Sequence, residues 1–539
     1  MYEVGKDINK FGFKRVNTAT VAHRRINFLY KWIICLVFAV FVCKTLFLGI
    51  QGNDINHNDE SSWLNERADI YDRNGEVLAK NIISGHIMLR PKVVTDVDAT
   101  AQVIHRILPE YSVNDAIKLI NESSFIYLKK FATDEQRRIV RNAKLPGLEI
   151  EPVKMRHYPK GRRFSHVVGF VGNDGHGLEG AELTYDDYLR QNKDPLYLSV
   201  DARIQEQFYT QLTIAMQKYQ ARGAMGMLMD SRTGEMIAMV SLPDYNPERI
   251  GSDPVRNRKF KPMRDVLEMG SIFKIFNTAL AYENGINKKY YVAKPYNILD
   301  ARGRVATTIH DVSSFKPSHP NFTVDEIMLH SCNVGSVQIA LDLPDGAQKS
   351  FFERVHLSEP LNLEFGKTER SLMPKKWGPV EKATVSFGHG ISVTPMHLLL
   401  AVNAMTNGGI YIYPTLLKRN IGRVVGERVL DDGISAKLRE IMVRIAEETS
   451  GKQARVSGIT IGGKTATAEK RDSAGKADSK RNTTAFIGVF PAEAPQYIIL
   501  VVLDEPQGTK ESWGWRTAAW NAVPTTGKIL DGILPLLFE

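Results

Sequence analysis

Residues 267 to 277 read LEMGSIFKIFN and place a serine and a lysine, Ser271 and Lys274, three positions apart. Residues with this spacing lie on one face of a helix, so the hydroxyl group and the amine can meet. The apolar residues around Lys274 would exclude water, which disfavours an ammonium ion and lowers the pKa of a lysine. The pair therefore predicts a serine nucleophile and a lysine general base that is substantially neutral at pH 7.

The same spacing also has a purely structural explanation. The chain contains 70 Lys and Arg residues, and a Ser-x-x-Lys sequence is often only a helix cap followed by a solvated lysine. A catalytic role for Ser271 and Lys274 therefore depends on further reactive residues elsewhere in the chain.

Two further segments supply such residues. The segment LHSCNVGS contains Ser331 and Asn333, a hydroxyl group and an amide that can relay a proton or hold a carbonyl group. The segment GGKTATAEK contains Lys464, Thr465 and Thr467, and the alternation of a strand puts the two threonines on one face, where they can bind a carboxylate or a carbonyl. Each segment alone could be an ordinary helix start or strand, but three such segments in this order on one exported domain are a strong indication of a functional site.

The elements that must position these residues form a recognisable pattern. Residues 223 to 243 read as two apolar strands around a Thr233-Gly234 turn, and residues 457 to 504 contain three more strands rich in β-branched residues, the first including residues 459–461. Mostly helical sequence lies between them, and residues 520 to 539 read as a closing amphipathic helix. This order predicts an α+β domain over residues 196–539, an antiparallel sheet with an inserted helical lobe.

The start of the chain is basic and then strongly apolar. Residues 1–31 contain seven basic and two acidic side chains, so this segment carries half of the chain's net charge of +10. The basic excess is therefore concentrated at one end, which argues against a nucleic-acid-binding surface elsewhere. Residues 32–50, WIICLVFAVFVCKTLFLGI, are long enough to cross a bilayer as a helix, with the basic tail inside. A cleaved signal peptide is the alternative, but its apolar part would be shorter and would end in a small-residue cleavage site. We therefore expect a membrane anchor with the rest of the chain exported.

The exported part begins with a region that shows no catalytic pattern. Residues 51–195 contain an Asn74-Gly75 hairpin turn and polar helical patterns near residues 96 to 145, which indicate a spacer and docking domain. Only Cys332 lies beyond the apolar span, so the exported part can form no internal disulfide. No metal-ligand spacing is present either, and we expect no metal or cofactor.

The reactive segments together resemble the class B penicillin-binding proteins. Ser271-Ile272-Phe273-Lys274 is similar to the first motif of that family, Ser331-Cys332-Asn333 to the second, and Lys464-Thr465-Ala466 to the third. The third motif departs from the family pattern, because Ala466 stands where a glycine is usual. The segments RADIYDRNGEVLA, GLEGAE and SFGHGISVTPMHL extend the likeness to class B. The combination of LEMGSIFK, FGHGISVTP and TAAWNAVPTTGKI is closest to the septal, cell-division transpeptidases of Gram-negative bacteria.

This resemblance implies a penicillin-binding-protein or serine β-lactamase-like fold and a D,D-transpeptidase. Ser271 would attack the D-Ala-D-Ala bond of a peptidoglycan stem peptide, and an amine from a second stem peptide would take the acyl group. Lys274 would deprotonate Ser271, Ser331 and Asn333 would relay the proton and position the substrate, and Lys464 with Thr465 and Thr467 would bind the substrate. The backbone N–H groups of Ser271 and Thr467 would hold the oxyanion. β-Lactams, divisome proteins including a polytopic glycosyltransferase, and a location at the septal inner membrane are also implied.

Several alternatives stay open at this point. The resemblance also fits a non-catalytic division scaffold, a β-lactamase or β-lactam sensor, and a cell-elongation transpeptidase. From a different class, residues 458 to 465, GITIGGKT, satisfy the G-x-x-x-x-G-K-[ST] phosphate-loop pattern. That pattern requires a strand before it and a helix after it, whereas a segment rich in Ser, Gly and Lys follows here.

The segment 469–482 is expected to be a solvated hairpin loop, and His389 a packing residue.

Overall fold

The computed structural model describes residues 67–300, 302–312, 315–471 and 477–538, together with a few residues between 35 and 44. The chain divides into two compact units, residues 1–62 and 63–539, and the second contains every candidate site residue. No helix in the described part of the chain is long and apolar enough to cross a membrane. The predicted basic tail lies outside the described residues, and so do twelve of the nineteen residues of the predicted span.

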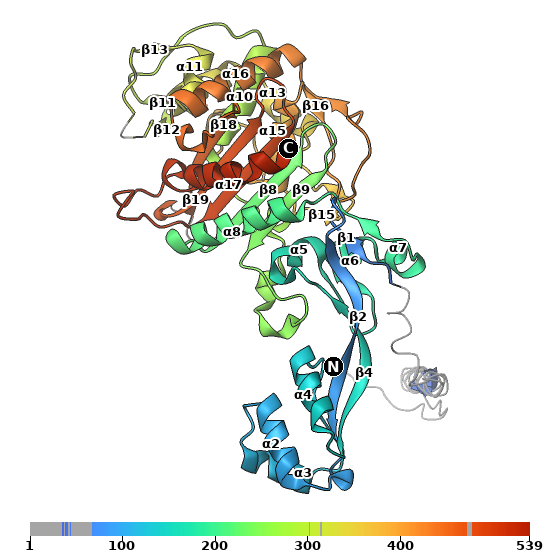
Figure 1. The fold of residues 1–539 in the computed structure, drawn as a ribbon. Helices are drawn as coiled ribbons and strands as arrows, with labels where there is room; N and C mark the ends of the chain where they lie inside the picture. The colour runs from blue at the N-terminus through green and yellow to red at the C-terminus, as the bar shows by residue number, and fades with distance from the viewer. Residues whose placement is uncertain are drawn as a thin grey trace, which may run out of the picture. The chain divides into compact units, whose positions relative to one another are not determined.

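A five-stranded antiparallel sheet forms the centre of the C-terminal part of the chain, as predicted (Figure 1). Its order is β18-β19-β20-β8-β9, so strands from both ends of this part lie side by side and β18 is an edge strand. The strands are β8 (Gly223–Asp230), β9 (Met236–Leu242), β18 (Gly462–Arg471), β19 (Ala477–Phe490) and β20 (Tyr497–Asp504).

Both faces of this sheet are buried, and the alternation of strand side chains explains how. In β20, Ile498, Leu500 and Val502 belong to the larger core, whereas Ile499, Val501 and Leu503 belong to a smaller core on the other face. The smaller core is covered by α8 (Ala202–Lys218) and the closing helix α17 (Ala522–Leu537), which lie together on that face (Figure 1). The predicted closing helix is thereby confirmed.

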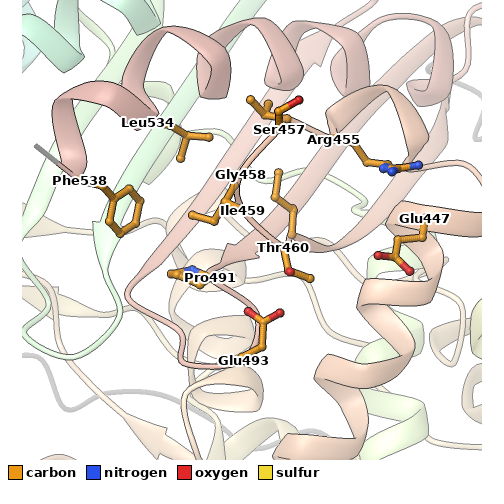
Figure 2. A pocket seen from close by; sticks show the side chains of 12 residues that line it. Glu447, Arg455, Ser457, Gly458, Ile459, Thr460, Pro491, Glu493, Leu534 and Phe538 are labelled. Carbon is orange, nitrogen blue, oxygen red and sulfur yellow. The ribbon is translucent and has the colours of Figure 1, made fainter.

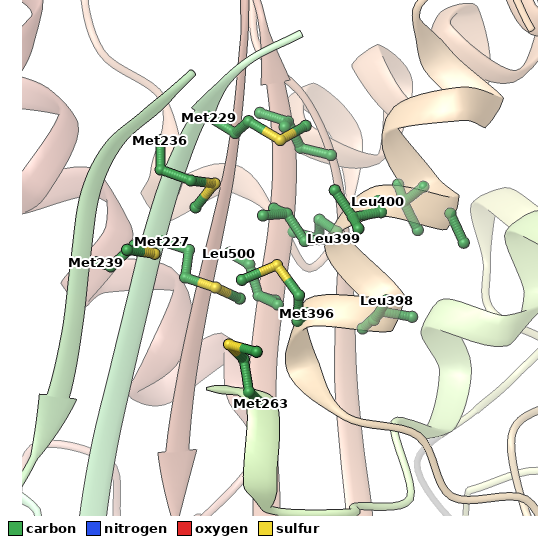
Figure 3. Packing of buried hydrophobic residues seen from close by; sticks show 14 of the residues in the cluster. Met227, Met229, Met236, Met239, Met263, Met396, Leu398, Leu399, Leu400 and Leu500 are labelled. Carbon is green, nitrogen blue, oxygen red and sulfur yellow. The ribbon is translucent and has the colours of Figure 1, made fainter. Parts of the chain in front are cut away.

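The larger core joins the sheet to the helical lobe. Methionines of β8 and β9 pack against the entirely buried helix α15 (Pro395–Thr406), as Figure 3 shows. Methionine is unbranched and flexible, so it fills the irregular space between a twisted sheet and a helix. The remaining lobe helices are α9 (Lys261–Arg264), α10 (Lys274–Glu283), α11 (Val324–Leu329), α12 (Asn333–Asp342), α13 (Ala347–Arg354), α14 (Pro379–Val385) and α16 (Asp432–Glu448).

Two-stranded antiparallel pairs lie between the helices of the lobe. Two are hairpins, β11 (Tyr296–Leu299) with β12 (Val305–Ile309) and β14 (Asn362–Leu363) with β15 (Gly366–Lys367); the other two join strands farther apart in sequence, β10 (Tyr290–Tyr291) with β13 (Asn321–Phe322) and β16 (Ile410–Tyr411) with β17 (Glu427–Arg428). The β11–β12 hairpin matters for the site, because the chain that leaves β12 runs to Asp311.

The preceding region has a sheet and a small core of its own. The predicted Asn74-Gly75 turn joins β1 to β2, which continues for 13 residues and pairs with β4 over ten positions. Three helices pack on this sheet in the predicted 96–145 region. The elements are β1 (Ile70–Tyr71), β2 (Val77–Leu89), α2 (Val97–Ile107), α3 (Val113–Glu122), β3 (Ile126–Lys129), α4 (Asp134–Ala143), β4 (Leu148–His157), β5 (Phe170–Val171), β6 (Gly177–Glu179), α5 (Ser165–Val168), α6 (Gly180–Thr184), α7 (Asp186–Gln191) and β7 (Leu196–Tyr197).

Two local expectations about the sheet were wrong or incomplete. Residues 459–461 do not form a strand, because β18 begins at Gly462; their apolar side chains pack beside α17 instead of pairing with a neighbouring strand. The predicted loop 469–482 is largely strand, since β18 and β19 continue to Arg471 and from Ala477. Its charges are partly paired as well, because Lys470 and Arg481 both lie 3.0 Å from Glu505.

Candidate functional site

The nucleophile candidate Ser271 lies in a short 3₁₀ turn, η7 (Gly270–Phe273), which continues into α10. Gly270 has a positive φ of 46°, and this turn is tightly enclosed. A Cβ on Gly388 would lie 2.1 Å from the carbonyl oxygen of Gly270, and a Cβ on Gly270 would lie 3.2 Å from the carbonyl oxygen of Thr467. Glycine at 270 therefore lets the turn approach edge strand β18 closely, and glycine at 388 lets the next loop lie against the turn from another side.

The amine of Lys274 is buried beneath this turn and has four polar neighbours. Its Nζ lies 2.7 Å from the carbonyl oxygen of Ser331 and 2.7 Å from Asn333 Oδ1, both of which can only accept hydrogen bonds. Ser271 Oγ and Ser331 Oγ lie at 3.1 and 3.2 Å. A neutral amine would donate its two N–H groups to these two acceptors, so its lone pair would be available to accept a proton from a hydroxyl group. This geometry suits a general base acting on Ser271.

The turn between α11 and α12 brings Ser331 and Asn333 to that amine. Ser331 has a φ of 57°, in the left-handed region that a non-glycine residue adopts only at some cost. The Asn333 amide donates from Nδ2 to the carbonyl oxygen of His310 at 3.2 Å, which leaves Oδ1 directed at Lys274. A strained serine and an oriented amide at one point indicate a built site rather than an ordinary helix start.

Lys464 reaches the same place from the sheet. Its side chain is fully buried, and its Nζ donates to Ser331 Oγ at 3.0 Å and to the carbonyl oxygen of Thr465 at 3.3 Å. Ser271, Lys274, Ser331, Asn333 and Lys464, which come from three separated segments, are therefore linked through one set of hydrogen bonds.

The two threonines lie beside this cluster and have partners that the sequence did not reveal. Thr465 Oγ1 lies 2.9 Å from Ser450 Oγ, so two hydroxyl groups are adjacent there. Thr467 Oγ1 accepts a hydrogen bond from the backbone N–H of Ala518 at 3.0 Å. As expected from strand alternation, Ala466 lies on the other face, buried in the larger core. No contact of Thr465 or Thr467 with Lys274 is recorded among the described residues, so the threonines would act on a substrate rather than on the base.

Burial sets the protonation of the two lysines. Loss of water lowers the pKa of Lys274 to about 8, against the opposing effect of the Asp311 carboxylate. Burial first, and then the charge of Lys274, lower the pKa of Lys464 well below its ordinary value. The direction expected for Lys274 is right, but about a tenth rather than most of it would be neutral at pH 7. Asp311, which the sequence did not single out, accounts for the smaller change.

A pocket of about 710 Å³ lies away from this cluster, beside the segment that satisfies the phosphate-loop pattern (Figure 2). Ser457 to Thr460 line it together with Arg455 and the carboxylates of Glu447 and Glu493, so its charged side chains are acidic by one charge and do not favour a phosphate group. Strand β18 begins inside this segment, at Gly462, and continues where a phosphate loop needs a helix, and Lys464 points to Ser331 instead. The nucleotide-binding interpretation is therefore wrong.

His389 lies in the loop that backs the nucleophile turn. Its ring packs edge to face on Phe387, with ring centroids 4.9 Å apart, and the neighbouring Gly390 N–H donates to Glu268 at 3.1 Å. No three His, Cys, Asp or Glu side chains within the described ranges gather closely enough to hold a metal ion.

Comparison with known proteins matches two families to the chain. The Penicillin binding protein transpeptidase domain matches residues 224–523 and the Penicillin-binding Protein dimerisation domain matches residues 64–212. Ser271 to Thr467, the whole candidate cluster, lies inside the first match.

Individual proteins agree with this assignment. The probable peptidoglycan D,D-transpeptidase FtsI of Caulobacter vibrioides is 32% identical over 484 residues, which cover 87% of this chain and 81% of the relative. The peptidoglycan D,D-transpeptidase FtsI of Escherichia coli is 29% identical over 507 residues, covering 87% and 83%. A crystal structure of a peptidoglycan synthetase from Bifidobacterium adolescentis shares the fold, with a TM-score of 0.64, 19% identity and coverage of 88% and 95%. The chain therefore belongs to the penicillin-binding proteins, with a transpeptidase domain preceded by a dimerisation domain.

Proposed function

We propose that this penicillin-binding protein is a serine D,D-transpeptidase that cross-links peptidoglycan stem peptides during septal cell-wall synthesis and that β-lactams acylate it. Ser271 Oγ attacks the carbonyl carbon between the two terminal D-alanines and the C–N bond breaks. D-Alanine leaves and an ester remains on Ser271. An amine of a second stem peptide then displaces Ser271 and forms the new amide bond. The observation that carries this proposal is the Lys274 amine, 3.1 Å from Ser271 Oγ with both its N–H groups directed to other acceptors.

Each proton has a carrier in this scheme. Lys274 takes the hydroxyl proton of Ser271, and the Ser331 hydroxyl, between the two lysines, delivers a proton to the departing amine and regains one from Lys274. In the second step Lys274 takes the proton that the attacking amine loses, and returns it to Ser271 Oγ as the ester C–O bond breaks. Asn333 positions both the substrate amide and the Lys274 amine. The backbone N–H groups of Ser271 and Thr467 stabilise the oxyanion, because the nucleophile turn packs against β18 at Thr467. Loss of one such donor typically costs about a hundredfold or more in rate.

The substrate carboxylate belongs with Lys464, Thr465 and Thr467 in this proposal. Thr465 is near the surface at 9% exposure, whereas Lys464 is fully buried. A carboxylate that reaches the Lys464 side of the cluster would favour the ammonium form, which burial alone disfavours. Substrate binding would therefore recharge Lys464 while Lys274 takes up its proton from Ser271.

The other parts of the chain complete the proposal. We assign residues 1–31 to a cytoplasmic tail, 32–50 to a single inner-membrane anchor, 51–195 to a periplasmic pedestal and 196–539 to the transpeptidase domain. The similarity to two proteins named FtsI supports a place at the division septum, among divisome proteins that include a polytopic glycosyltransferase. A non-catalytic scaffold is the second candidate, and Ala466 in place of the usual glycine is the one observation that favours it.

A fluorescent-penicillin gel tests the catalytic proposal. The full chain in detergent should be labelled covalently, and Ser271→Ala should remove the label. Among the described residues, only the Ser271 hydroxyl both lies in the η7 turn and contacts the Lys274 amine. Ser350→Ala, an exposed serine on α13, is the matched control and should leave labelling unchanged. Labelling of Ser271→Ala at the wild-type level would contradict the assignment, provided that circular dichroism shows the same unfolding temperature for the three proteins.

A further inference from the structure

An acidic residue that no motif contains, Asp311, lies directly behind the turn that carries Ser331 and Asn333. It follows β12 and is half-buried. Its Oδ1 accepts a short hydrogen bond from the backbone N–H of Asn333. The preceding residue contributes too, because the carbonyl oxygen of His310 accepts from Asn333 Nδ2. The two residues after β12 therefore hold Asn333 by both its backbone and its side chain.

The second carboxylate oxygen of Asp311 also has a partner. The Cys332 Sγ lies 3.2 Å from Oδ2 and donates to it. Burial, and then the charge of Asp311, raise the pKa of the Cys332 thiol to about 12, so the thiol stays protonated and neutral. No lysine, arginine or histidine forms an ion pair with Asp311 in the described part of the chain. Its negative charge thus acts on the buried amine of Lys274.

The geometry points to Asp311 as a positioning residue, which orients Asn333 toward Lys274 and holds a negative charge behind the turn that contacts the base. This inference rests on the proposed function and adds to it a residue outside the three motifs. A carboxylate that favours the ammonium form makes the amine a stronger base, which increases the driving force for removing the Ser271 proton. Asp311 would therefore lower the neutral fraction of Lys274 at pH 7, and would make proton transfer from Ser271 to the neutral amine faster.

Other charged groups near α10 do not reach its first residue. Asp325 on α11 accepts from the Tyr282 hydroxyl, Lys437 on α16 lies over the Tyr282 ring and Arg354 on α13 pairs with Glu283. All three thus contact the C-terminal end of α10. His397 on α15 bonds to Thr394 and to the Glu359 carbonyl. Beside Asp311, the titratable groups that face Lys274 are the neutral Cys332 thiol and Lys464.

The test is the second-order rate constant for acylation by one penicillin, measured on the full chain in detergent between pH 6 and pH 10. Asp311→Asn removes the charge but keeps an oxygen that can accept from the Asn333 N–H. We expect the rising limb of its profile to move to lower pH by about half to one unit, with a plateau several-fold lower than that of wild type. Asp300→Asn, on the exposed turn of the same hairpin, removes the same charge far from the base and should leave the limb in place.

The outcomes separate charge from structure. If Asp311→Asn has a lower rate but the wild-type midpoint, Asp311 is only structural and the inference is wrong. If Asp311→Asn does not fold, Asp311→Ser gives the same comparison with a smaller neutral hydrogen-bond acceptor. If neither variant folds, while Asp311→Glu is folded and active, the role of Asp311 is structural and the inference is likewise overturned. A wild-type chain that penicillin does not label at all would instead contradict the proposed function, so the two failures are distinguishable.

Discussion

The amines of Lys274 and Lys464 approach a single hydroxyl group from two sides, at 3.2 and 3.0 Å from Ser331 Oγ. Lys274 is 1% exposed and Lys464 is fully buried. Two ammonium ions at these positions would repel each other without water to screen them. Burial and this repulsion therefore disfavour positive charge on both amines at once: the pKa of Lys464 is lowered by burial and by the charge of Lys274, whereas the Asp311 carboxylate favours the charged form of Lys274.

This protonation state predicts how acylation depends on pH. The neutral amine is the base, so the rate must rise as pH rises through the pKa of Lys274, which is about 8. Between pH 7 and pH 9 the neutral fraction increases roughly tenfold, and the second-order rate constant for penicillin acylation should follow it. A profile that rises only above roughly pH 10, where a solvated lysine titrates, would remove Lys274 from the role of base.

Asn333→Asp should move this profile in the opposite direction. The substitution places a carboxylate oxygen where Oδ1 now lies, 2.7 Å from the Lys274 amine, and a negative charge so close stabilises the ammonium ion. We expect the rising limb to move up by about one pH unit or more, with at least a tenfold lower acylation rate at pH 7. Asn297→Asp on exposed strand β11 adds the same charge as a control. An unmoved limb in Asn333→Asp would show that Asn333 does not face the base in solution.

The sequence predicted those parts of this molecule that depend on local pattern. The alternation in β20, the turn at Asn74-Gly75 and the closing helix follow from periodicity and turn chemistry, which neighbouring residues determine. Residues 459–461 were misjudged because apolar, β-branched residues pack against a helix as readily as they pair in a sheet.

The candidate site shows the same division. Ser271 and Lys274 can be related by helical spacing, but only the resemblance to a family joined them to Ser331, Asn333 and Lys464, which lie far away in sequence. Asp311 and Ser450 were missed because they stand in irregular segments, where no periodicity indicates which way a side chain points. An acidic residue directly after a short strand and about twenty positions before Ser331 is the only sequence signal that could have indicated Asp311.

A buried ion network supports the region that precedes the transpeptidase domain. Glu182 on α6 accepts from Arg67 and Arg156, at 2.7 Å in each case, and none of the three side chains is more than 1% exposed. Glu182→Gln would leave two buried guanidinium groups with less compensation, and breaking such a network typically costs about 3–5 kcal/mol. We expect a clearly lower urea midpoint than for Glu179→Gln, which alters an exposed glutamate three residues earlier. Equal midpoints for the two variants would mean that the network contributes little.

The last prediction separates the enzyme from a non-catalytic scaffold and concerns Ala466. The side chain is 3% exposed, faces the larger core and pairs in register with Ala485 of β19. Its methyl group therefore lies on the face opposite to Thr465 and Thr467, and any effect on the substrate must come from a small displacement of β18. Such overpacking costs about 1–2 kcal/mol, which corresponds to roughly five- to thirtyfold in rate.

We therefore expect the wild-type chain to be acylated, and Ala466→Gly to react faster by no more than that factor while losing about 0.5–1 kcal/mol of stability to the added freedom of glycine. Ala485→Gly removes the partner methyl group across the sheet and is the matched control for stability. The measurements are the second-order acylation rate constant with one penicillin and the free energy of unfolding. If wild type shows no acylation while Ala466→Gly reacts readily, the alanine has disabled the site, and the scaffold becomes the better description of this protein.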